Sequence, residues 1–385
     1  MFLSTVAGAT ASRQGEHRAI VDLVKSGLGL IRSDADITPA WVEGVLRGSG
    51  HLEENVKVTG VSLERVGEGV GILSILQRIR PSYSGATSAP ASFVIKYPTD
   101  DPGQRFTADA LAFYIRECIF YRDHAVGAAF GTADCYAQGI ASDNTDFTVA
   151  LQDISGLRNL NQLEGVSIED SKTILSKLAD FHAAWWDNAG LDGMTDVFQP
   201  LSNPTYHMVL PMLWSQGWPS LLEQAPEIVP EAIKPVGDLW GPKVQWMLDN
   251  LSLPRTLCHG DYRADNIMFD GNDPVVLDFQ IVGVGGGMYD VGYYISQSID
   301  ASVRAGRDRE LVDHYLDRLA HHGITMDRDE AWRQYQICIV FCLTYSVVNW
   351  PQYPNMNERG QCLLRDMLQR AITCVLDNNA LDAVR

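Results

Sequence analysis

The sequence predicts an α+β, two-lobed protein, with an antiparallel sheet plus a helix in the N-terminal lobe and mainly helices in the C-terminal lobe. Three observations predict this arrangement. The chain has 385 residues, a length that favours two or three packed units over a single core. Residues 56–154 contain short β-rich runs separated by Gly-, Ser- and Pro-containing breaks. Beyond residue 165 the apolar side chains recur mainly at helical spacing.

We expect three segments: an N-terminal helical segment at 1–55, an N-lobe at 56–154 and a C-lobe at 155–385. Helix is expected in the first segment because Thr38 suits an N-cap and Pro39 suits the first helical position. The N-lobe should contain, in order, three antiparallel strands at 58–67, 71–83 and 91–98, one helix across 106–127, and strands at 135–140 and 146–154.

The C-lobe should begin with a turn-rich crossing between the lobes at 155–165. Ser167 then precedes Asp170 by three residues, which predicts a capped helix over 166–187. His182 lies near the apolar face of that helix, so we expect it to be a hydrogen-bonded core histidine. Further helices are expected over most of 203–250 and 306–380, with one short β segment between them.

Composition narrows the classes of function. The net charge of −18 opposes contact with phosphate backbones or anionic membranes, so nucleic acid is not expected as a partner. The chain has no run of roughly 18 apolar residues, and its N-terminus lacks the features of a secretory signal. The seven cysteines form no CxxC pair, which argues against a disulfide framework or a zinc knuckle. We therefore expect a soluble, cytoplasmic protein with no membrane partner.

The segment at 256–280 carries the densest polar chemistry of the chain. Two short apolar runs flank the turn sequence DGND at 270–273, which predicts a hairpin. If the first and last turn residues pair, Asn266 falls opposite Leu277, about 5 Å away, and next to Asp278. An amide oxygen and a carboxylate then meet at the open end of the hairpin, where they can share a magnesium ion. A wider turn would shift the register by one, and Asn266 would then lie directly opposite Asp278 or further away.

Asp261 lies five residues before Asn266, on the loop that enters this hairpin. From that position its carboxylate can accept a proton from a hydroxyl near the metal. The residues alone thus predict one acid that binds metal and a second acid that orients or deprotonates a nucleophile.

The sequence HGDYRADN at 259–266 fits the pattern H-G-D-x-x-x-x-N without gaps. Here the chain resembles the aminoglycoside phosphotransferase and choline kinase superfamily of small-molecule kinases, which carries this catalytic loop. The segment LDFQ at 277–280 resembles the metal-binding D-F-x segment of that family. Its Gln, together with YDVG at 289–292, looks most like the ecdysteroid-kinase-like branch. Protein kinases carry Arg where Gly260 stands, so the resemblance, which extends from about residue 40 to the C-terminus, does not favour a protein kinase.

This resemblance implies a protein-kinase-like fold and the transfer of phosphate from ATP, with Mg²⁺, to a hydroxyl of a small molecule. Asp261 would be the catalytic residue, and Asn266 and Asp278 would hold Mg²⁺. Lys96 on the third strand matches the lysine that contacts the α- and β-phosphates, and Glu117 matches its partner on the helix. A cation is needed there because the charge of the triphosphate must be neutralised.

Further residues acquire roles from the same resemblance. His259 would support the catalytic loop, and Asp290 would hold the loop backbone through hydrogen bonds. The segment LQDI at 151–154 resembles the hinge between the lobes, where backbone groups of Gln152 and Ile154 would bind the adenine edge. Arg263 has two interpretations, contact with the transferring phosphoryl oxygens or a structural role.

Three glycines, Gly67, Gly69 and Gly71, lie between the first two strands of the N-lobe. Their backbone N–H groups can approach phosphates closely, although the spacing is not the G-x-G-x-x-G of protein kinases. The alternative is an ordinary hairpin turn.

The C-terminal helices should bind the acceptor, because aromatic residues are frequent there. If they line a pocket, they suit a bulky apolar alcohol, such as a steroid-like or terpenoid hydroxyl, better than a polycationic sugar; the alternative is core packing. The aromatic residues concerned are Trp214, Trp218, Tyr293, Tyr294, Tyr345, Trp350 and Tyr353.

Two other classes of function remain open. One is a non-catalytic nucleotide-binding regulator of the same fold, against which the complete set of polar residues argues. The other is a metal-dependent hydrolase with Cys258, His259, Asp261 and Asp278 as ligands. Tightly bound zinc or iron would indicate the hydrolase, whereas weak magnesium that needs nucleotide would indicate the kinase.

Overall fold

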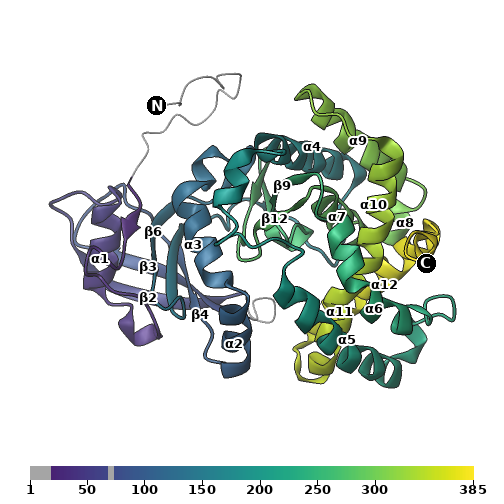
Figure 1. Cartoon of the computed structure of the whole chain (residues 1–385). Helices are drawn as coiled ribbons and strands as arrows, with labels where there is room; N and C mark the ends of the chain where they lie inside the picture. The colour runs from purple at the N-terminus through teal and green to yellow at the C-terminus, as the bar shows by residue number, and fades with distance from the viewer. Residues whose placement is uncertain (1–18, 68–72) are drawn as a thin grey trace.

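The computed structural model describes residues 19–67 and 73–385. Its two lobes lie side by side, an N-terminal lobe built around a sheet and a C-terminal lobe made mainly of helices (Figure 1). The two-lobed α+β arrangement predicted from the sequence is confirmed. None of the helices in the described part of the chain has the length and apolar character needed to span a bilayer.

A six-stranded sheet forms the core of the N-lobe, with the strand order β1-β6-β7-β4-β3-β2. The five strands expected from the sequence are present, and β2, β3 and β4 pair antiparallel as predicted. The strands are β1 (Val21–Asp22), β2 (Val58–Val66), β3 (Ser74–Tyr83), β4 (Phe93–Pro98), β6 (Cys135–Ile140) and β7 (Phe147–Gln152).

The N-terminal segment contains less helix than the sequence indicated. Over residues 19–55 the single α-helix is α1 (Pro39–Gly48), which begins where Thr38 accepts a hydrogen bond from the backbone N–H of Trp41 at 3.2 Å. Strand β1 joins the sheet instead, in parallel with β6. A strand of two residues is too short to show a period of its own in the sequence, so its pairing could not be predicted.

The helix expected across 106–127 is in fact two helices, α2 (Pro102–Ala110) and α3 (Phe113–Asp123). Between them Ala112 has a φ of 55°, in the left-handed region, which interrupts the helix and redirects the chain. The reason lies in burial: α2 buries only Ala108, whereas α3 buries most of its residues. A largely exposed helix and a largely buried one thus meet at Ala112, and the prediction of a single helix was wrong.

The C-lobe begins with the helix predicted at 166–187. Ser167 caps it by accepting a hydrogen bond from the backbone N–H of Asp170 at 3.1 Å. His182 is fully buried with both ring nitrogens hydrogen-bonded, as expected of a core histidine. The helices of this lobe are α4 (Ile168–Trp185), α5 (Pro204–Gln224), α6 (Val236–Asn250), α7 (Met288–Ser298), α8 (Ala301–Arg304), α9 (Asp308–His321), α10 (Arg328–Phe341), α11 (Leu343–Asn349) and α12 (Glu358–Asp377).

The hairpin of the C-lobe has the register predicted from its turn. Strand β10 (Ile267–Asp270) pairs antiparallel with β11 (Asp273–Val276), and the first and last turn residues lie opposite each other. Beyond the strands, the backbone N–H of Leu277 donates to the carbonyl of Asn266 at 2.9 Å. Asn266 and Asp278 therefore lie at the same end of the hairpin. The remaining short strands are β5 (Gly131–Thr132), β8 (Arg158–Asn159), β9 (Arg255–Cys258) and β12 (Gly283–Gly286).

Helices α5 and α11 lie in the lower part of the C-lobe, on the side toward the N-lobe (Figure 1). They pack so closely that a Cβ added to Gly217 of α5 would overlap the backbone carbonyl of Val347 on α11. A backbone carbonyl cannot move away as a flexible side chain can, so only glycine fits this contact. The position of α11 relative to α5 thus depends on the missing side chain.

We predict that Gly217→Ala destabilises the protein by about 1–3 kcal/mol, the usual cost of overpacking. Gly241→Ala on α6 is the matched control, because a Cβ there would meet no atom within 4 Å. The control should keep or slightly raise the stability, since alanine favours helix over glycine. Urea denaturation of the three proteins measures both effects; equal stability of G217A and wild type would contradict the close packing.

Candidate active site

The catalytic loop expected at 259–266 connects β9 to the hairpin, and a buried carboxylate fixes its shape. Asp290, in the first turn of α7, accepts hydrogen bonds from the backbone N–H groups of His259 at 2.6 Å and Gly260 at 2.9 Å. His182 donates to the same carboxylate at 3.1 Å. Asp290 thus contacts the loop backbone in the manner expected from the sequence.

Glycine is required at position 260. Its φ of 87° lies in the left-handed region, and an added Cβ would come within 2.5 Å of the carbonyl oxygen of Ile281. The imidazole of His259 bridges the loop and the hairpin. Its Nε2 lies 3.0 Å from the carbonyl of Leu277 and donates to it, while Nδ1 accepts from the N–H of Asp261 at 3.2 Å. Both ring nitrogens are therefore engaged in supporting the loop.

Three donors surround the carboxylate of Asp261. Tyr293 donates its hydroxyl to Oδ1 at 2.6 Å, and Asn266 donates its amide to Oδ2 at 2.9 Å. The Nε of Arg263 reaches the two oxygens at 3.2 and 3.4 Å. The side chain of Asp261 is 17% exposed. A carboxylate has about four acceptor positions, so a substrate hydroxyl can still bind to this oriented group.

The guanidinium of Arg263 lies among oxygen atoms of neighbouring side chains. Besides Asp261, its guanidinium contacts the Oε1 of Gln162 at 3.0 Å and the carboxylate of Asp265 at 3.3 Å. Asp265 in turn accepts from Arg359 of α12 at 3.1 Å. Of the two interpretations of Arg263, these contacts favour the structural one, because its Nε and Nη1 already donate to protein oxygens.

Asn266 and Asp278 offer the oxygen ligands that Mg²⁺ prefers. The amide nitrogen of Asn266 donates to Asp261, and its Oδ1 is therefore left as the atom able to bind a cation. Asp278 has a φ of 65° and a carboxylate that is 35% exposed. A left-handed backbone is uncommon for a residue with a side chain, and such strain is frequent at functional sites. The donor set of the two residues fits a magnesium ion.

Lys96 on β4 connects the two lobes. Its ammonium group lies 2.9 Å from the carboxylate of Glu117 on α3 and 3.0 Å from the carboxylate of Asp278. The structure thus brings together a cation of the N-lobe and an acid at the end of the C-lobe hairpin. Lys96 and Glu117 are buried.

One ammonium group cannot neutralise two carboxylates. Burial raises the pKa of Glu117 to about 7, against the attraction of Lys96. Burial also opposes ionisation of Asp278, but the positive charge of Lys96 holds the pKa of that carboxyl below its usual value. At neutral pH, Lys96 and Asp278 therefore form the charged pair, while Glu117 titrates.

A second contact between the lobes lies next to this pair. Gln280 donates its amide to the hydroxyl of Ser74 on β3 at 2.8 Å. Arg116, the neighbour of Glu117 on α3, is fully buried and donates to the carbonyl of Val282 at 3.3 Å. Ser74 and Arg116 were not predicted from the sequence, since nothing in their local pattern signals contacts with residues so far along the chain.

The three glycines of the N-lobe cannot all be placed. Gly67 has a φ of 71°, which favours glycine, and it follows directly after β2. Gly69 and Gly71 lie outside the described residues.

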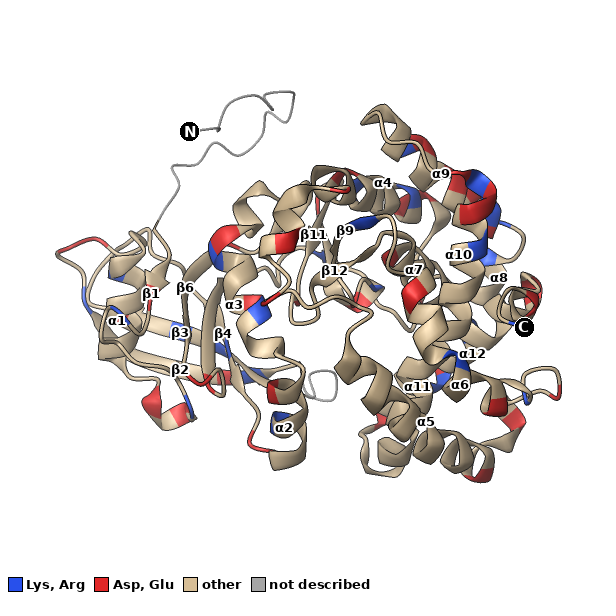
Figure 2. Ribbon diagram, viewed as in Figure 1, with Lys and Arg blue, Asp and Glu red and all other residues tan. Residues whose placement is uncertain are grey.

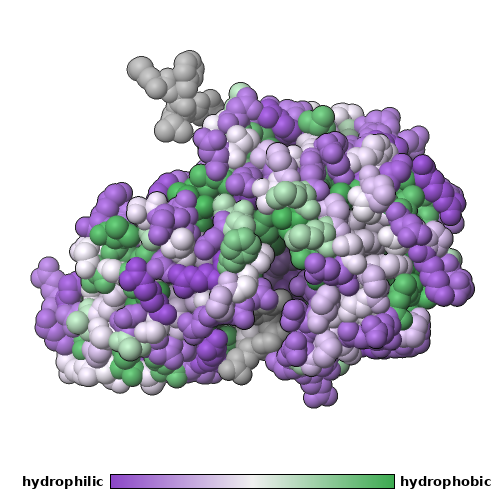
Figure 3. Space-filling model, turned by 60° about the horizontal axis from the view of Figure 1, so that its bottom comes forward, coloured by the Kyte–Doolittle hydropathy of each residue, from purple (hydrophilic) through white to green (hydrophobic). Residues whose placement is uncertain are grey.

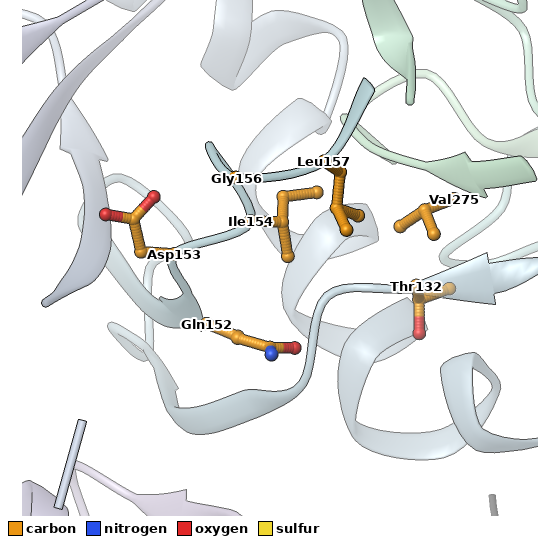
Figure 4. A pocket seen from close by; sticks show the side chains of 7 residues that line it. All are labelled: Thr132, Gln152, Asp153, Ile154, Gly156, Leu157 and Val275. Atoms are coloured by element: carbon orange, nitrogen blue, oxygen red, sulfur yellow. The ribbon is translucent and has the colours of Figure 1, made fainter. Parts of the chain in front are cut away.

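The proposed hinge lies at the end of β7, where it borders a pocket (Figure 4). Gln152 and Ile154 both line this pocket, and the apolar side chains of Ile154, Leu157 and Val275 converge in it. The carbonyl of Ile154 accepts from the N–H of Leu157 at 2.9 Å and closes a turn. The lining contains neither Lys96 nor the residues of the catalytic loop, so the pocket lies beside the hinge rather than at the metal ligands.

The ligand set of the rival hydrolase does not assemble. Among the residues that the structure describes, one group of three or more His, Cys, Asp or Glu side chains has its ligand atoms within 4.8 Å of one another: His182, Cys258 and Asp290. These three are buried, His182 and Asp290 are already hydrogen-bonded to each other, and Asp290 also accepts from the loop backbone. His259, Asp261 and Asp278 do not join Cys258 as ligands.

The aromatic residues of the C-lobe divide into two sets. Tyr345 and Tyr353 are partly exposed. For the others, core packing is the correct interpretation, because they are buried; these are Trp214, Trp218, Tyr293, Tyr294 and Trp350. Tyr293 nevertheless reaches the site through its hydroxyl. Its position one helical turn after Asp290 was the signal that might have revealed this, since residues three apart share a helix face.

Residues 109–335 match the family model described as "Phosphotransferase enzyme family". The chain belongs to this family. The match covers more than half of the chain and includes Glu117, the catalytic loop and Asp278. Family membership makes this protein a phosphotransferase of the aminoglycoside phosphotransferase and choline kinase superfamily, whose members act on small molecules. No sequence of a curated protein matches the chain.

Solved structures with low sequence identity share the fold. Choline kinase from Cryptosporidium parvum superposes with a TM-score of 0.52 at 9% identity, covering 89% of this chain and 94% of that chain. Ethanolamine kinase from Plasmodium vivax gives 0.51 at 14% identity, covering 92% and 91%. The GDP and kanamycin complex of APH(2″)-IIIa gives 0.50 at 15% identity, covering 85% and 95%. At these identities the likeness shows the fold, which is the two-lobed kinase-like fold.

The raised pKa of Glu117 predicts a dependence of stability on pH. Between about 4.5, the ordinary pKa of a glutamate, and about 7, the folded protein keeps a proton that the unfolded chain has released. The stabilisation from this group is therefore complete below pH 4.5 and is lost as the pH rises through 7. Glu117→Gln removes it, so the free energy of unfolding of wild type relative to E117Q should fall by up to about 1.4 kcal/mol per pH unit in this window.

Urea denaturation at pH 5, 6 and 7 measures this difference at constant ionic strength. Glu223→Gln, at an exposed position near the end of α5, is the control and should give a difference that does not change with pH. A difference that grows with pH would contradict the prediction, because it would mean that Lys96 keeps Glu117 ionised throughout.

Proposed function

We propose that this protein transfers the γ-phosphoryl group of ATP, with Mg²⁺, to a hydroxyl of a bulky, uncharged small molecule. The observation that carries the proposal is the 3.0 Å contact between Lys96 and Asp278, beside the loop in which Asn266 contacts Asp261. A cation for phosphate, two oxygen ligands for a metal and an acid that can take a proton are thereby gathered between the lobes. Phosphoryl transfer requires these groups and little covalent chemistry from the protein.

In this proposal Lys96 contacts the α- and β-phosphates, and Glu117 orients its ammonium group. Asn266 and Asp278 would hold Mg²⁺, which would supply neutralising charge to the phosphates. Asp261 orients the acceptor hydroxyl and receives its proton. The acceptor oxygen forms a bond to the γ-phosphorus, the bond from that phosphorus to the bridging oxygen breaks, and ADP leaves.

Backbone groups of the N-lobe would bind the nucleotide base and the phosphates. Gln152 and Ile154 would bind the adenine edge at the hinge. Gly67, Gly69 and Gly71 would bring N–H groups to the phosphates. His259 and Asp290 do not touch the nucleotide in this proposal, because their hydrogen bonds hold the loop.

Two uncharged stretches support an uncharged acceptor. Residues 204–222 and 334–357 contain no Asp, Glu, Lys or Arg, although 20% of the chain is charged. These stretches include most of α5 and all of α11, which are drawn almost wholly in tan in Figure 2. A polycationic sugar would need carboxylates at its site, and these two stretches contain none.

The first half of α5 is apolar and yet not buried. Over residues 204–213 no side chain is buried, and Met208 and Met212 are highly exposed. Figure 3 shows apolar side chains gathered beside the hollow between the lobes. Helix α5, which carries Tyr206, packs against α11. Tyr345 of α11 packs on the ring of Tyr293, whose hydroxyl donates to Asp261 at 2.6 Å. This apolar surface therefore continues to Asp261, where an acceptor hydroxyl is needed.

The branch and the compartment are part of the proposal. Gln280 and the segment at 289–292 support the ecdysteroid-kinase-like branch. All seven cysteines are free, which fits a reducing compartment such as the cytoplasm. Among the solved relatives, the named ligands and substrates include kanamycin and choline, and both are positively charged. The uncharged surface of α5 and α11 leads us to expect a different acceptor here.

Two substitutions separate the roles of the acids. Asp261→Asn should lower phosphate transfer by at least about 100-fold and leave Mg-ATP affinity unchanged, because this acid acts on the acceptor. Asp278→Ala should abolish metal-dependent ATP binding, since it removes the charged ligand. Radiolabelled phosphate transfer and calorimetric titration with ATP, with and without Mg²⁺, measure both. A regulator without catalysis would bind Mg-ATP in the wild type and transfer no phosphate to any acceptor.

A panel of alcohols tests the acceptor. We expect transfer from radiolabelled ATP to uncharged alcohols with a bulky apolar body, and not to kanamycin or choline. Tyr206→Ala should raise the KM for the best alcohol about 10-fold with an unchanged KM for ATP, because it removes apolar contact area. Trp246→Ala, at an exposed position on α6, is the control. Transfer to kanamycin alone would overturn the expectation.

A further inference from the structure

The shortest hydrogen bond to the carboxylate of Asp261 comes from a tyrosine that the phosphoryl-transfer scheme does not use. We propose that Tyr293 is a positioning residue, whose hydroxyl fixes the plane of the Asp261 carboxylate for the acceptor hydroxyl. This inference rests on the function proposed above and adds a second side chain to the machinery around Asp261.

Helix α7 carries two side chains that reach the catalytic loop. Asp290 and Tyr293 lie three residues apart and therefore on the same face of this helix. Asp290 accepts from the consecutive backbone N–H groups of His259 and Gly260, and Tyr293 donates to Asp261 at 2.6 Å. One rigid helix thus sets both the path of the loop and the orientation of the acid that the loop carries.

The hydroxyl of Tyr293 is protonated and needs an acceptor. Tyr293 is 2% exposed, and a buried phenol needs a hydrogen-bond partner. Burial, and then the charge of Asp261, raises the pKa of Tyr293 well above its ordinary value. The hydroxyl therefore keeps its proton and donates it to the carboxylate, which can only accept when ionised.

Without such a donor, the plane of the Asp261 carboxylate would be free to rotate. Rotation about the terminal bond of an aspartate is only weakly restricted, so its plane is fixed by its partners. Asn266 holds Oδ2 of Asp261, and Arg263 reaches both oxygens at longer distances. Tyr293 is the short donor on Oδ1. Its loss would leave one side of the carboxylate without a close partner.

The ring of Tyr293 is itself held from the acceptor side. Tyr345 of α11 packs on it with 4.4 Å between ring centroids and an interplanar angle of 33°. Tyr345 is partly exposed and belongs to the uncharged stretch at 334–357. The surface proposed for the acceptor therefore contacts the residue that orients Asp261, so that binding and orientation share one pair of rings.

The experiment compares Tyr293→Phe with Tyr294→Phe. Tyr294 is the next residue on α7, is equally buried, and loses an equivalent hydrogen bond, since its hydroxyl lies 3.0 Å from that of Ser171 on α4. The readouts are kcat, the KM for ATP, and the urea midpoint of unfolding, with the best alcohol of the panel as acceptor. We expect Y293F to lower kcat by roughly 10- to 100-fold with the KM for ATP unchanged, the size expected for misplacement of a catalytic group. Y294F should keep kcat within about threefold.

A double variant tests whether the effect passes through Asp261. In the Asp261→Asn background, Tyr293→Phe should cause no further loss of transfer, because the group that it orients has been removed. Independent, additive losses would overturn the inference, as would full kcat in Y293F or a fall in kcat matched by Y294F. A wild type that transfers phosphate to no alcohol would instead contradict the proposed function, and this inference would fall with it.

Discussion

A buried carboxylate at the start of α7 determines the shape of the loop that carries Asp261. Asp290 accepts hydrogen bonds from two consecutive backbone N–H groups, in a turn that only glycine can complete at position 260. Each of these donors would cost about 1–3 kcal/mol if buried without a partner. His182 of α4 donates a further hydrogen bond to the same carboxylate. The positions of Asp261 and Asn266 follow from this set of contacts, and the rest of the site is built around them.

The sequence was informative where a local rule applied. The turn at 270–273 fixed the hairpin register, and with it the neighbourhood of Asn266 and Asp278, before any resemblance was used. The pairing of Lys96 with Asp278 joins residues of different lobes, and it was not predicted. The family resemblance identified both residues but gave them different partners. The interruption at Ala112 was missed because the sequence pattern over 106–127 does not show that its two halves are buried to different extents.

Net charge and local charge give different information about this protein. The value of −18 opposes contact with nucleic acid but does not identify an acceptor. The absence of charge over 204–222 and 334–357 is more informative, because Tyr345 of α11 packs on the tyrosine that donates to Asp261, and α5 packs against α11. The contact of Gly217 with the backbone of Val347 holds these two helices together. A substitution in this packing would thus alter the surface proposed for the acceptor without touching a polar residue.

The hydrogen bond between Gln280 and Ser74 joins the N-lobe to the chain just after Asp278, the proposed metal ligand. A movement of one lobe relative to the other would therefore act mechanically on that ligand. By thermodynamic reciprocity, an arrangement of the lobes that preserves this bond should strengthen cation affinity, and a bound cation should restrict the lobes in return. Substrate-free samples would then differ in lobe mobility according to the magnesium concentration alone, before any nucleotide is added.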